Sequence, residues 1–146
     1  KLVTMVRTEA RAQAERFGLS RILIDGPPGI GCPVISSLTG TSLAIIVTEP
    51  TASGIHDLER VIELTRHFQI PAAVIINKSD INLDCTDSIE HYCVQKDIRL
   101  LGRLPYESAI SEAQRQGKTI VQYAPDLPAA KAMRGISEQI KTLYKE

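Results

Sequence analysis

The chain has 146 residues, 43% of them hydrophobic, and 17 Lys and Arg balance 17 Asp and Glu, so we expect a single domain over residues 1–146 with its own core. A formal net charge of zero gives no field that would attract nucleic acid or anionic lipid, and no apolar run approaches the ~20 residues of a membrane span. Three irregularly spaced cysteines favour a cytoplasmic protein over a disulfide-bonded one.

The first part of the chain predicts one helix and two strands. Residues 1–17 carry apolar side chains at helical spacing, and Gly18 is a natural stop for that helix. Residues 21–25 are a short, β-branched apolar run that predicts a strand ending on a carboxylate. Residues 42–48 contain a continuous apolar run, which is typical of strands buried on both faces of a parallel sheet.

The rest of the chain alternates helices and strands. Helical periodicity predicts a helix over residues 54–68, with Ser53 as its candidate N-cap. The patterns further predict strands over 72–76 and 98–104, and helices over 86–95, 108–116 and 126–144. Strands that alternate with helices predict an α/β fold, a parallel three-layer α/β/α sheet. Ligands bind such sheets beyond the carboxyl ends of the strands, where this sequence places Asp25, Glu49, Asn77 and Pro105.

The segment Asp25-Gly-Pro-Pro-Gly-Ile-Gly-Cys-Pro33 is the strongest local signal. A carboxylate at the end of a buried strand can hold Mg²⁺, and the glycines after it let backbone amides approach a terminal phosphate. This is the logic of a Walker B and switch segment. The simpler alternative is a Gly/Pro turn that leaves a strand, with Asp25 merely capping it.

A second signal, Asn77-Lys78-Ser79-Asp80, follows the strand predicted over 72–76. The Asn side chain offers both a donor and an acceptor, which suits the edge of a nucleobase. An NKxD segment at such a strand end reads guanine in GTP-binding domains. The motif itself leaves adenine and guanine open.

Two other phosphate-binding readings fail. Gly29-Ile30-Gly31 could begin a dinucleotide-binding fingerprint with Glu49 as the ribose acid, but Val34 occupies the third glycine position. Residues 117–119, Gly-Lys-Thr, follow a predicted helix and lack the upstream glycine of a phosphate loop, so a helix-ending glycine and a turn explain them better. No G-x-x-x-x-G-K-[ST] motif occurs in the 146 residues.

From residue 23 to residue 82 the sequence closely resembles the MinD/ParA-type P-loop ATPases, and within them the subfamily with an inserted ferredoxin-like pair of 4Fe-4S clusters. The resemblance rests on the DGPPGIGCP and TEPT segments and on the run into NKSD, and it continues through Leu104-Pro105-Tyr106-Glu107 to Gly117. It implies an ATP-binding protein of the cytoplasm that hydrolyses ATP as a sandwich dimer. It also implies an iron–sulfur or redox protein as partner.

The resemblance also implies roles for five residues. The aspartate that organises the Mg²⁺ shell in the family falls on Asp25, and the glycine that meets the γ-phosphate falls on Gly29. The asparagine that reads adenine falls on Asn77, and the loop that flanks the base falls on Pro105 and Tyr106. The cofactors implied are therefore ATP and Mg²⁺, with 4Fe-4S clusters in the family.

The deviant phosphate loop and the cluster-ligand cysteines of the family would lie upstream of Lys1. We therefore expect this chain to be the C-terminal part of a MinD-like domain, P-loop NTPase-like but without the P-loop strand, and to hydrolyse ATP poorly by itself. In the family that strand lies between the strands matching 21–25 and 42–48. The expectation is that these two strands pair directly, or that the chain self-associates through them.

Two rival functions remain at this point. One is a GTPase-type domain that reads guanine through the NKSD segment. The other is a non-catalytic module for dimerisation and partner binding. The histidines and cysteines lack metal-ligand spacing, so no metal site beyond Asp25 is predicted.

Overall fold

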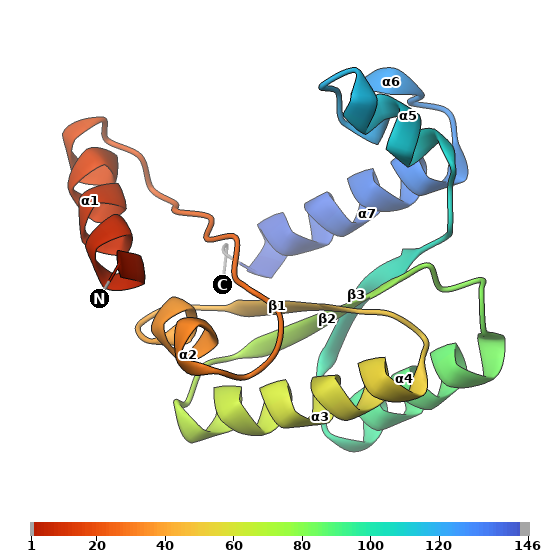
Figure 1. Cartoon of the computed structure of the whole chain (residues 1–146), viewed down its shortest axis with the longest axis horizontal. Coiled ribbons are helices and arrows are strands. Elements are labelled where there is room, and N and C mark those ends of the chain that lie inside the picture. The colour runs from red at the N-terminus through yellow and green to blue at the C-terminus, as the bar shows by residue number, and fades with distance from the viewer. Residues whose placement is uncertain (1, 144–146) are drawn as a thin grey trace. The chain divides into compact units, whose positions relative to one another are not determined.

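The computed structural model describes residues 2–143 and has the predicted α/β architecture, a parallel sheet with flanking helices (Figure 1). The strands are β1 (Ala44–Thr48), β2 (Ala72–Asn77) and β3 (Arg99–Leu104), and the helices are α1 (Leu2–Arg16), α2 (Cys32–Leu38), α3 (Ala52–His67), α4 (Leu83–Gln95), α5 (Ala109–Arg115), α6 (Ile120–Tyr123) and α7 (Pro128–Leu143). The predicted ends of the first and last helices, at residues 1 and 144, lie outside the described residues.

The chain divides into two compact units. One comprises the described residues up to Ala44 together with Glu59–Pro71, and the other comprises Ile45–Leu58 and the described residues from Ala72 onward. The expectation of one domain over residues 1–146 stays a prediction.

The first unit is built on helices. Gly18 adopts a left-handed φ of +64°, and the backbone N–H of Leu19 donates to the carbonyl of Ala14 at 2.8 Å, so α1 ends where predicted. The guanidinium of Arg7 on α1 donates to the backbone carbonyl of Ser36 on α2 at 2.7 Å. This hydrogen bond joins the two helices, and Ala14 on α1 is buried.

The predicted strand over residues 21–25 is wrong. Residues 19–27 have neither helix nor strand structure, and the side chains of Ile22 and Leu23 are 44% and 94% exposed. A β-branched run becomes a strand only when a neighbouring strand accepts its backbone hydrogen bonds. Among the described residues the sheet contains only β1, β2 and β3, so the predicted direct pairing of 21–25 with 42–48 is also wrong. Self-association stays a prediction.

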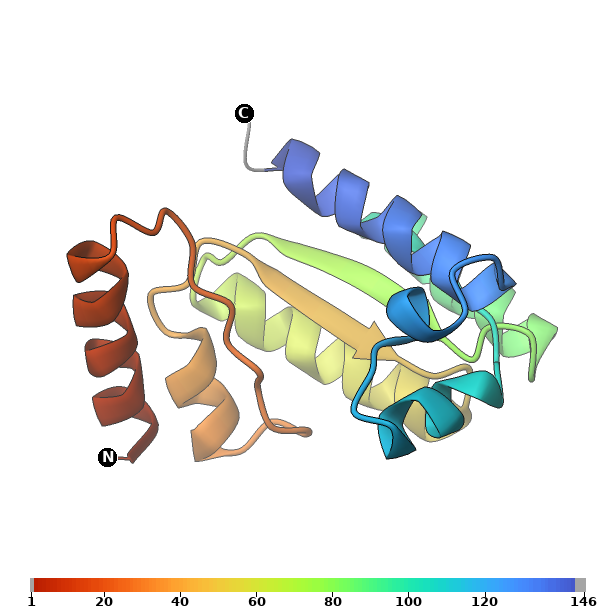
Figure 2. The same ribbon diagram turned by 90° about the horizontal axis from the view of Figure 1, so that it is seen from above.

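The second unit holds the sheet, in the order β1-β2-β3, with β2 and β3 parallel. Figures 1 and 2 show α4 on one face of the sheet and α7 on the other. Val74 and Ile76 on β2, Ile89 on α4 and Leu101 on β3 are at most 1% exposed and form the centre of this layer structure.

A β-bulge and a glycine let α7 lie close to β3. The register between β2 and β3 shifts between Val74 and Ile75, so that Ile75 faces Gly102. Gly102 has a φ of +156°, and a Cβ there would lie 2.8 Å from Cγ1 of Ile136 on α7. The position therefore requires glycine.

Several helix starts differ from the sequence-based expectation: α4 begins at Leu83 and not at residue 86, and the short α2 was not predicted. Helix α3 begins at Ala52, and the N–H of Gly54 donates to Oγ1 of Thr51 at 2.9 Å, so Thr51 caps the helix instead of Ser53. Thr119 forms a capping box with Gln122 at the start of the short α6, which was not predicted. Gly117 adopts a φ of +65° just after α5, which confirms that residues 117–119 are a turn and not a phosphate loop.

Candidate functional site

Polar side chains meet where β1 and β2 end. Glu49 directly follows β1, and Asn77 is the last residue of β2. Oε1 of Glu49 accepts a hydrogen bond from Nδ2 of Asn77 at 3.4 Å and lies 2.8 Å from Nζ of Lys78. The rule that parallel strands gather their carboxyl ends along one edge therefore holds for these two strands.

The turn after β1 is held tightly against the first turn of α3. Oγ1 of Thr48 donates to the carbonyl of Gly54 at 3.0 Å, while the N–H of Gly54 donates to Thr51. A Cβ at Gly54 would lie 2.3 Å from the carbonyl oxygen of Glu49, so only glycine lets the turn approach so closely. This packing fixes the backbone that carries Glu49.

The turn after β2 is tied to the end of β3 through its Ser79 and Asp80. The N–H of buried Ser79 donates to the carbonyl of Leu104 at 3.0 Å, and the carbonyl of Ser79 accepts from Oγ1 of Thr86 at 2.7 Å. Oδ1 of the exposed Asp80 accepts from the N–H of Tyr106 at 2.6 Å. These bonds place residues 105–107 beside Asn77.

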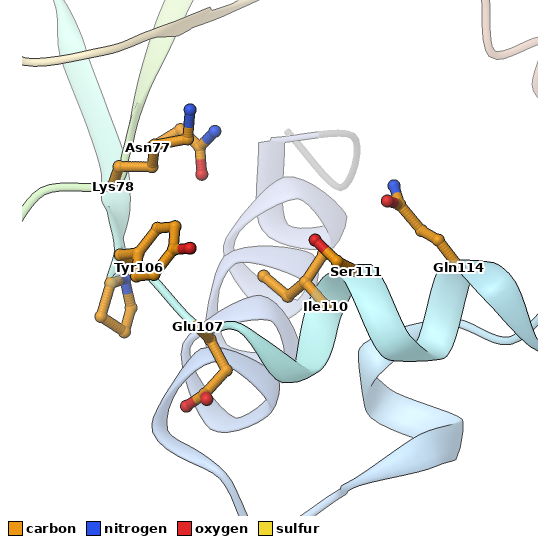
Figure 3. A pocket seen from close by; sticks show the side chains of 8 residues that line it. Asn77, Lys78, Tyr106, Glu107, Ile110, Ser111 and Gln114 are labelled. Atoms are coloured by element: carbon orange, nitrogen blue, oxygen red, sulfur yellow. The ribbon is translucent and has the colours of Figure 1, made fainter.

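An open pocket of about 220 Å³ lies at this edge of the sheet (Figure 3). Three of its residues are those expected to contact the nucleotide base: Asn77, Pro105 and Tyr106. The rest of its wall comes from Lys78, from Glu107 and from the α5 residues Ile110, Ser111 and Gln114. Their assignment to a nucleotide stays a prediction, but the structure brings all three base-site residues into one wall.

The pocket suits a planar base better than a whole nucleotide. Its volume falls below the ~300–1,000 Å³ of sites that enclose drug-sized ligands. Pro105, Ile110 and the Tyr106 ring supply apolar and aromatic surface, and Asn77 supplies an amide. Among the described residues that line it, Lys78 is the one cation, and its Nζ already pairs with Glu49.

Asp25 and Gly29 lie in the first unit, in the stretch before α2, and both are exposed. Gly29 has a φ of +87°, a left-handed conformation that suits glycine. Asp25 supplies one carboxylate, and Mg²⁺ in phosphate sites is usually held by one or two carboxylates together with phosphate oxygens and water. Asp25 thus offers one ligand of the kind that this ion takes, and the roles of Asp25 and Gly29 stay predictions.

Sequence reasoning missed the α5 side of the pocket. Gln114 follows Ile110 by four residues and Ser111 by three, so helical spacing could have placed them on one side of α5. It also missed the hydrogen bond between Asp80 and the backbone N–H of Tyr106, because the NKSD pattern predicts contact with a base and not with the neighbouring backbone. Within residues 2–143 no group of three or more His, Cys, Asp or Glu side chains is arranged to hold a metal ion.

A charged contact joins α4 to the strand that leads into the pocket. Nε of Arg103 on β3 lies 2.5 Å from Oε1 of Glu90 on α4, and Nη2 of Arg103 lies 3.5 Å from Oδ1 of Asp87. The hydrogen bond from Arg103 lowers the pKa of Glu90 from its ordinary value. Helix α4 and the end of β3 are thereby joined two residues before Pro105.

The chain matches a known family over most of its length. A ParA family model, described as NUBPL iron-transfer P-loop NTPase, matches residues 10–141. A cytosolic Fe-S cluster assembly factor, the Nubp1 homolog of Drosophila pseudoobscura pseudoobscura, is 30% identical over 146 residues, covering 86% of this chain and 46% of the relative. An uncharacterised protein of Methanocaldococcus jannaschii is 34% identical over 82 residues, covering 56% of this chain and 28% of the relative.

Solved structures share the fold. The MinD cell division protein of Aquifex aeolicus superposes with a TM-score of 0.76 at 23% identity, covering 92% of this chain and 58% of that one. The septum site-determining protein MinD of Pyrococcus horikoshii OT3, solved in complex with Mg-ADP, gives a TM-score of 0.73 at 26% identity, covering 84% of this chain and 51% of that one. This chain thus spans less than half of the two curated relatives above and little more than half of each MinD chain.

None of the helices in residues 2–143 combines the length and the apolarity needed to cross a bilayer.

Proposed function

The chain belongs to the ParA family of NUBPL-type iron-transfer P-loop NTPases, and from this membership we propose that it supplies the Walker B, switch and adenine-recognition parts of an ATP-hydrolysing protein that handles iron–sulfur clusters. The observation that carries the proposal is the shared pocket wall of Asn77, Pro105 and Tyr106 at the carboxyl edge of the sheet. The base of a nucleotide bound there would lie at the carboxyl ends of β2 and β3, which is where ligands bind in open α/β sheets.

Each predicted residue then has a task. Asn77 hydrogen-bonds the edge of the base, while Pro105 and Tyr106 cover its face. Asp25 holds Mg²⁺, and the backbone of Gly29 approaches the γ-phosphate. The metal ion, when bound, neutralises the charge that develops on the phosphate oxygens. We place the protein in the cytoplasm as a homodimer with an iron–sulfur or redox protein as its partner; the Drosophila relative is described as cytosolic.

The GTPase alternative rests on the NKSD segment, and the contacts of Asp80 weaken it. Guanine presents N–H donors that a free carboxylate would accept. Oδ1 of Asp80 instead accepts from the N–H of Tyr106, and Asp80 is not among the residues that line the pocket. Asp80 therefore holds the loop at residues 105–107, and this contact disfavours its role as a ligand of guanine.

Nucleotide affinity of the complete protein tests this assignment. We expect ATP to bind more tightly than GTP in calorimetric titration at fixed Mg²⁺. A clear preference for GTP would overturn the ATP assignment. The second rival, a non-catalytic dimerisation and partner-binding module, is tested by Asp25→Ala. We expect this change to remove most ATP hydrolysis, and unchanged hydrolysis would exclude a catalytic role for the segment.

A further inference from the structure

The side-chain amide of Asn77 carries one hydrogen-bond acceptor, its oxygen, and one donor group, its nitrogen. Whichever of the two points into the pocket decides which base is accepted. The oxygen Oδ1 only accepts and the nitrogen Nδ2 only donates. A neighbour that engages one of them therefore selects the other for the ligand. In this structure that neighbour is Glu49.

The Glu49 carboxylate can only accept hydrogen bonds when ionised, so the amide must turn its nitrogen toward it. Nδ2 of Asn77 lies 3.4 Å from Oε1 of Glu49 in that orientation. Nζ of Lys78 lies 2.8 Å from the same oxygen and holds the carboxylate in place. Figure 3 shows the Asn77 oxygen on the side of the Tyr106 ring.

We propose that Glu49 is a positioning residue that fixes the Asn77 amide with its oxygen toward the pocket, so that the site selects a base carrying an exocyclic amine at this edge. The inference rests on the proposed function and adds to it the source of base selectivity. Adenine presents its 6-amine as a donor, whereas guanine and hypoxanthine present a carbonyl oxygen in its place. Two acceptors would then face each other, which disfavours both of those bases.

The contact between Glu49 and Lys78 is suited to orientation more than to stability. The two side chains are 43% and 39% exposed, and ion pairs so open to solvent contribute little to folding. The backbone under Glu49 is fixed independently, by the bonds that Thr48 and Thr51 make with Gly54. Replacing the carboxylate should therefore leave the turn in place and free the amide.

The test compares ATP with inosine triphosphate, which carries an oxygen where ATP carries the amine. We expect the complete protein to bind ATP at least about tenfold more tightly than inosine triphosphate. Glu49→Met keeps the side-chain length but removes the acceptor, and Lys78 is then free to donate to the Asn77 oxygen. The preference for ATP should fall about tenfold, while Glu49→Gln, which retains one acceptor oxygen, should keep most of it.

Glu63→Met, at an exposed position of α3, is the matched control and should leave the preference unchanged. If the wild-type protein prefers ATP and Glu49→Met keeps the full preference, the inference is wrong while the proposed function stands. If the wild-type protein binds no purine nucleotide, both are wrong. A purely structural role for Glu49 would weaken both nucleotides equally and would also overturn the inference.

A measurement on the unmodified protein covers the case in which Glu49→Met does not fold. Purine riboside triphosphate has neither amine nor oxygen at that position of the base. With the Asn77 oxygen facing the pocket, affinity should decrease from ATP to purine riboside triphosphate to inosine triphosphate. An inosine triphosphate that binds more tightly than the purine analogue would show that the amide presents its nitrogen.

Discussion

Substitution of Asp80 distinguishes two possible roles of this residue: holding the loop at residues 105–107 in place, or hydrogen-bonding a guanine base. Its Oδ1 accepts the N–H of Tyr106 at 2.6 Å, across 26 positions in the sequence. Asp80→Ala removes that acceptor and leaves the Tyr106 amide to water. The turn itself keeps its bond from the N–H of Ser79 to the carbonyl of Leu104 at 3.0 Å. The change should therefore loosen residues 105–107 without unfolding the sheet.

The size of the effect follows from the exposure of the bond. Hydrogen bonds to charged groups contribute ~1.5–3 kcal/mol, but an exposed one competes with water, so we expect about 1 kcal/mol here. If the loop must be ordered before the base binds, ATP affinity should fall about fivefold. Asp80→Asn keeps an acceptor oxygen without the charge and should lose about half of that free energy.

Calorimetric titration with ATP and GTP, combined with hydrogen exchange at the Tyr106 amide, measures both consequences. Asp57→Ala, at an exposed position of α3, serves as the control. We expect faster exchange at Tyr106 and weaker ATP binding only in the Asp80 variants. Unchanged exchange and unchanged ATP affinity would refute the role of Asp80 in holding the loop. Loss of GTP binding with ATP binding intact would instead identify Asp80 as a guanine reader.

Three further predictions concern stability and reactivity. Gly102→Ala should destabilise the fold by about 2–4 kcal/mol in denaturant titration, because its Cβ would meet Ile136 at a left-handed φ; an effect below about 0.5 kcal/mol would contradict the close packing of α7 on β3. The hydrogen bond from Arg103 lowers the pKa of Glu90, so this contact stabilises the fold above the unfolded-state pKa of Glu90 and is lost as the pH falls through the folded-state pKa. Arg103→Met should therefore lower the melting temperature at pH 7 but not at pH 2. An equal decrease at both pH values would contradict the pairing. Burial, with a smaller contribution from Glu90, raises the pKa of the Cys93 thiol to about 11, so iodoacetamide at pH 8 should modify Cys93 only after denaturation, and rapid modification of the native protein would contradict its burial.

The sheet could be predicted because its strands carry their own signal. The continuous apolar runs at 42–48 and 72–76 match β1 and β2 closely. Burial on both faces, which such runs predict, holds for Ala73 to Ile76 on β2, whereas Val47 on β1 is 60% exposed. The run at 21–25 has the same composition but is no strand. Its apolar pattern records a preference for a sheet environment, while strand formation also needs a partner that the pattern does not contain.

The pocket could be predicted on its sheet side and not on its helix side. The rule for strand ends led to Asn77 and Pro105, and the resemblance to the family led to Tyr106. Ile110 and Gln114 share one side of α5, but they line the pocket only because α5 packs at that place. No local sequence pattern predicts this packing. The pairing of Glu49 with Asn77 joins residues 28 positions apart and became visible only in the folded chain.

The central claim is that a nucleotide base lies against Tyr106 with its edge at Asn77. The 146 residues contain no tryptophan, so Tyr106→Trp introduces a fluorophore at the pocket wall of the complete protein. We predict saturable quenching of the added emission by ATP, as the base stacks on the indole ring, and loss of that quenching when Asn77→Ala is added. ATP that binds, as measured by calorimetry, without changing this emission would contradict the placement of the base.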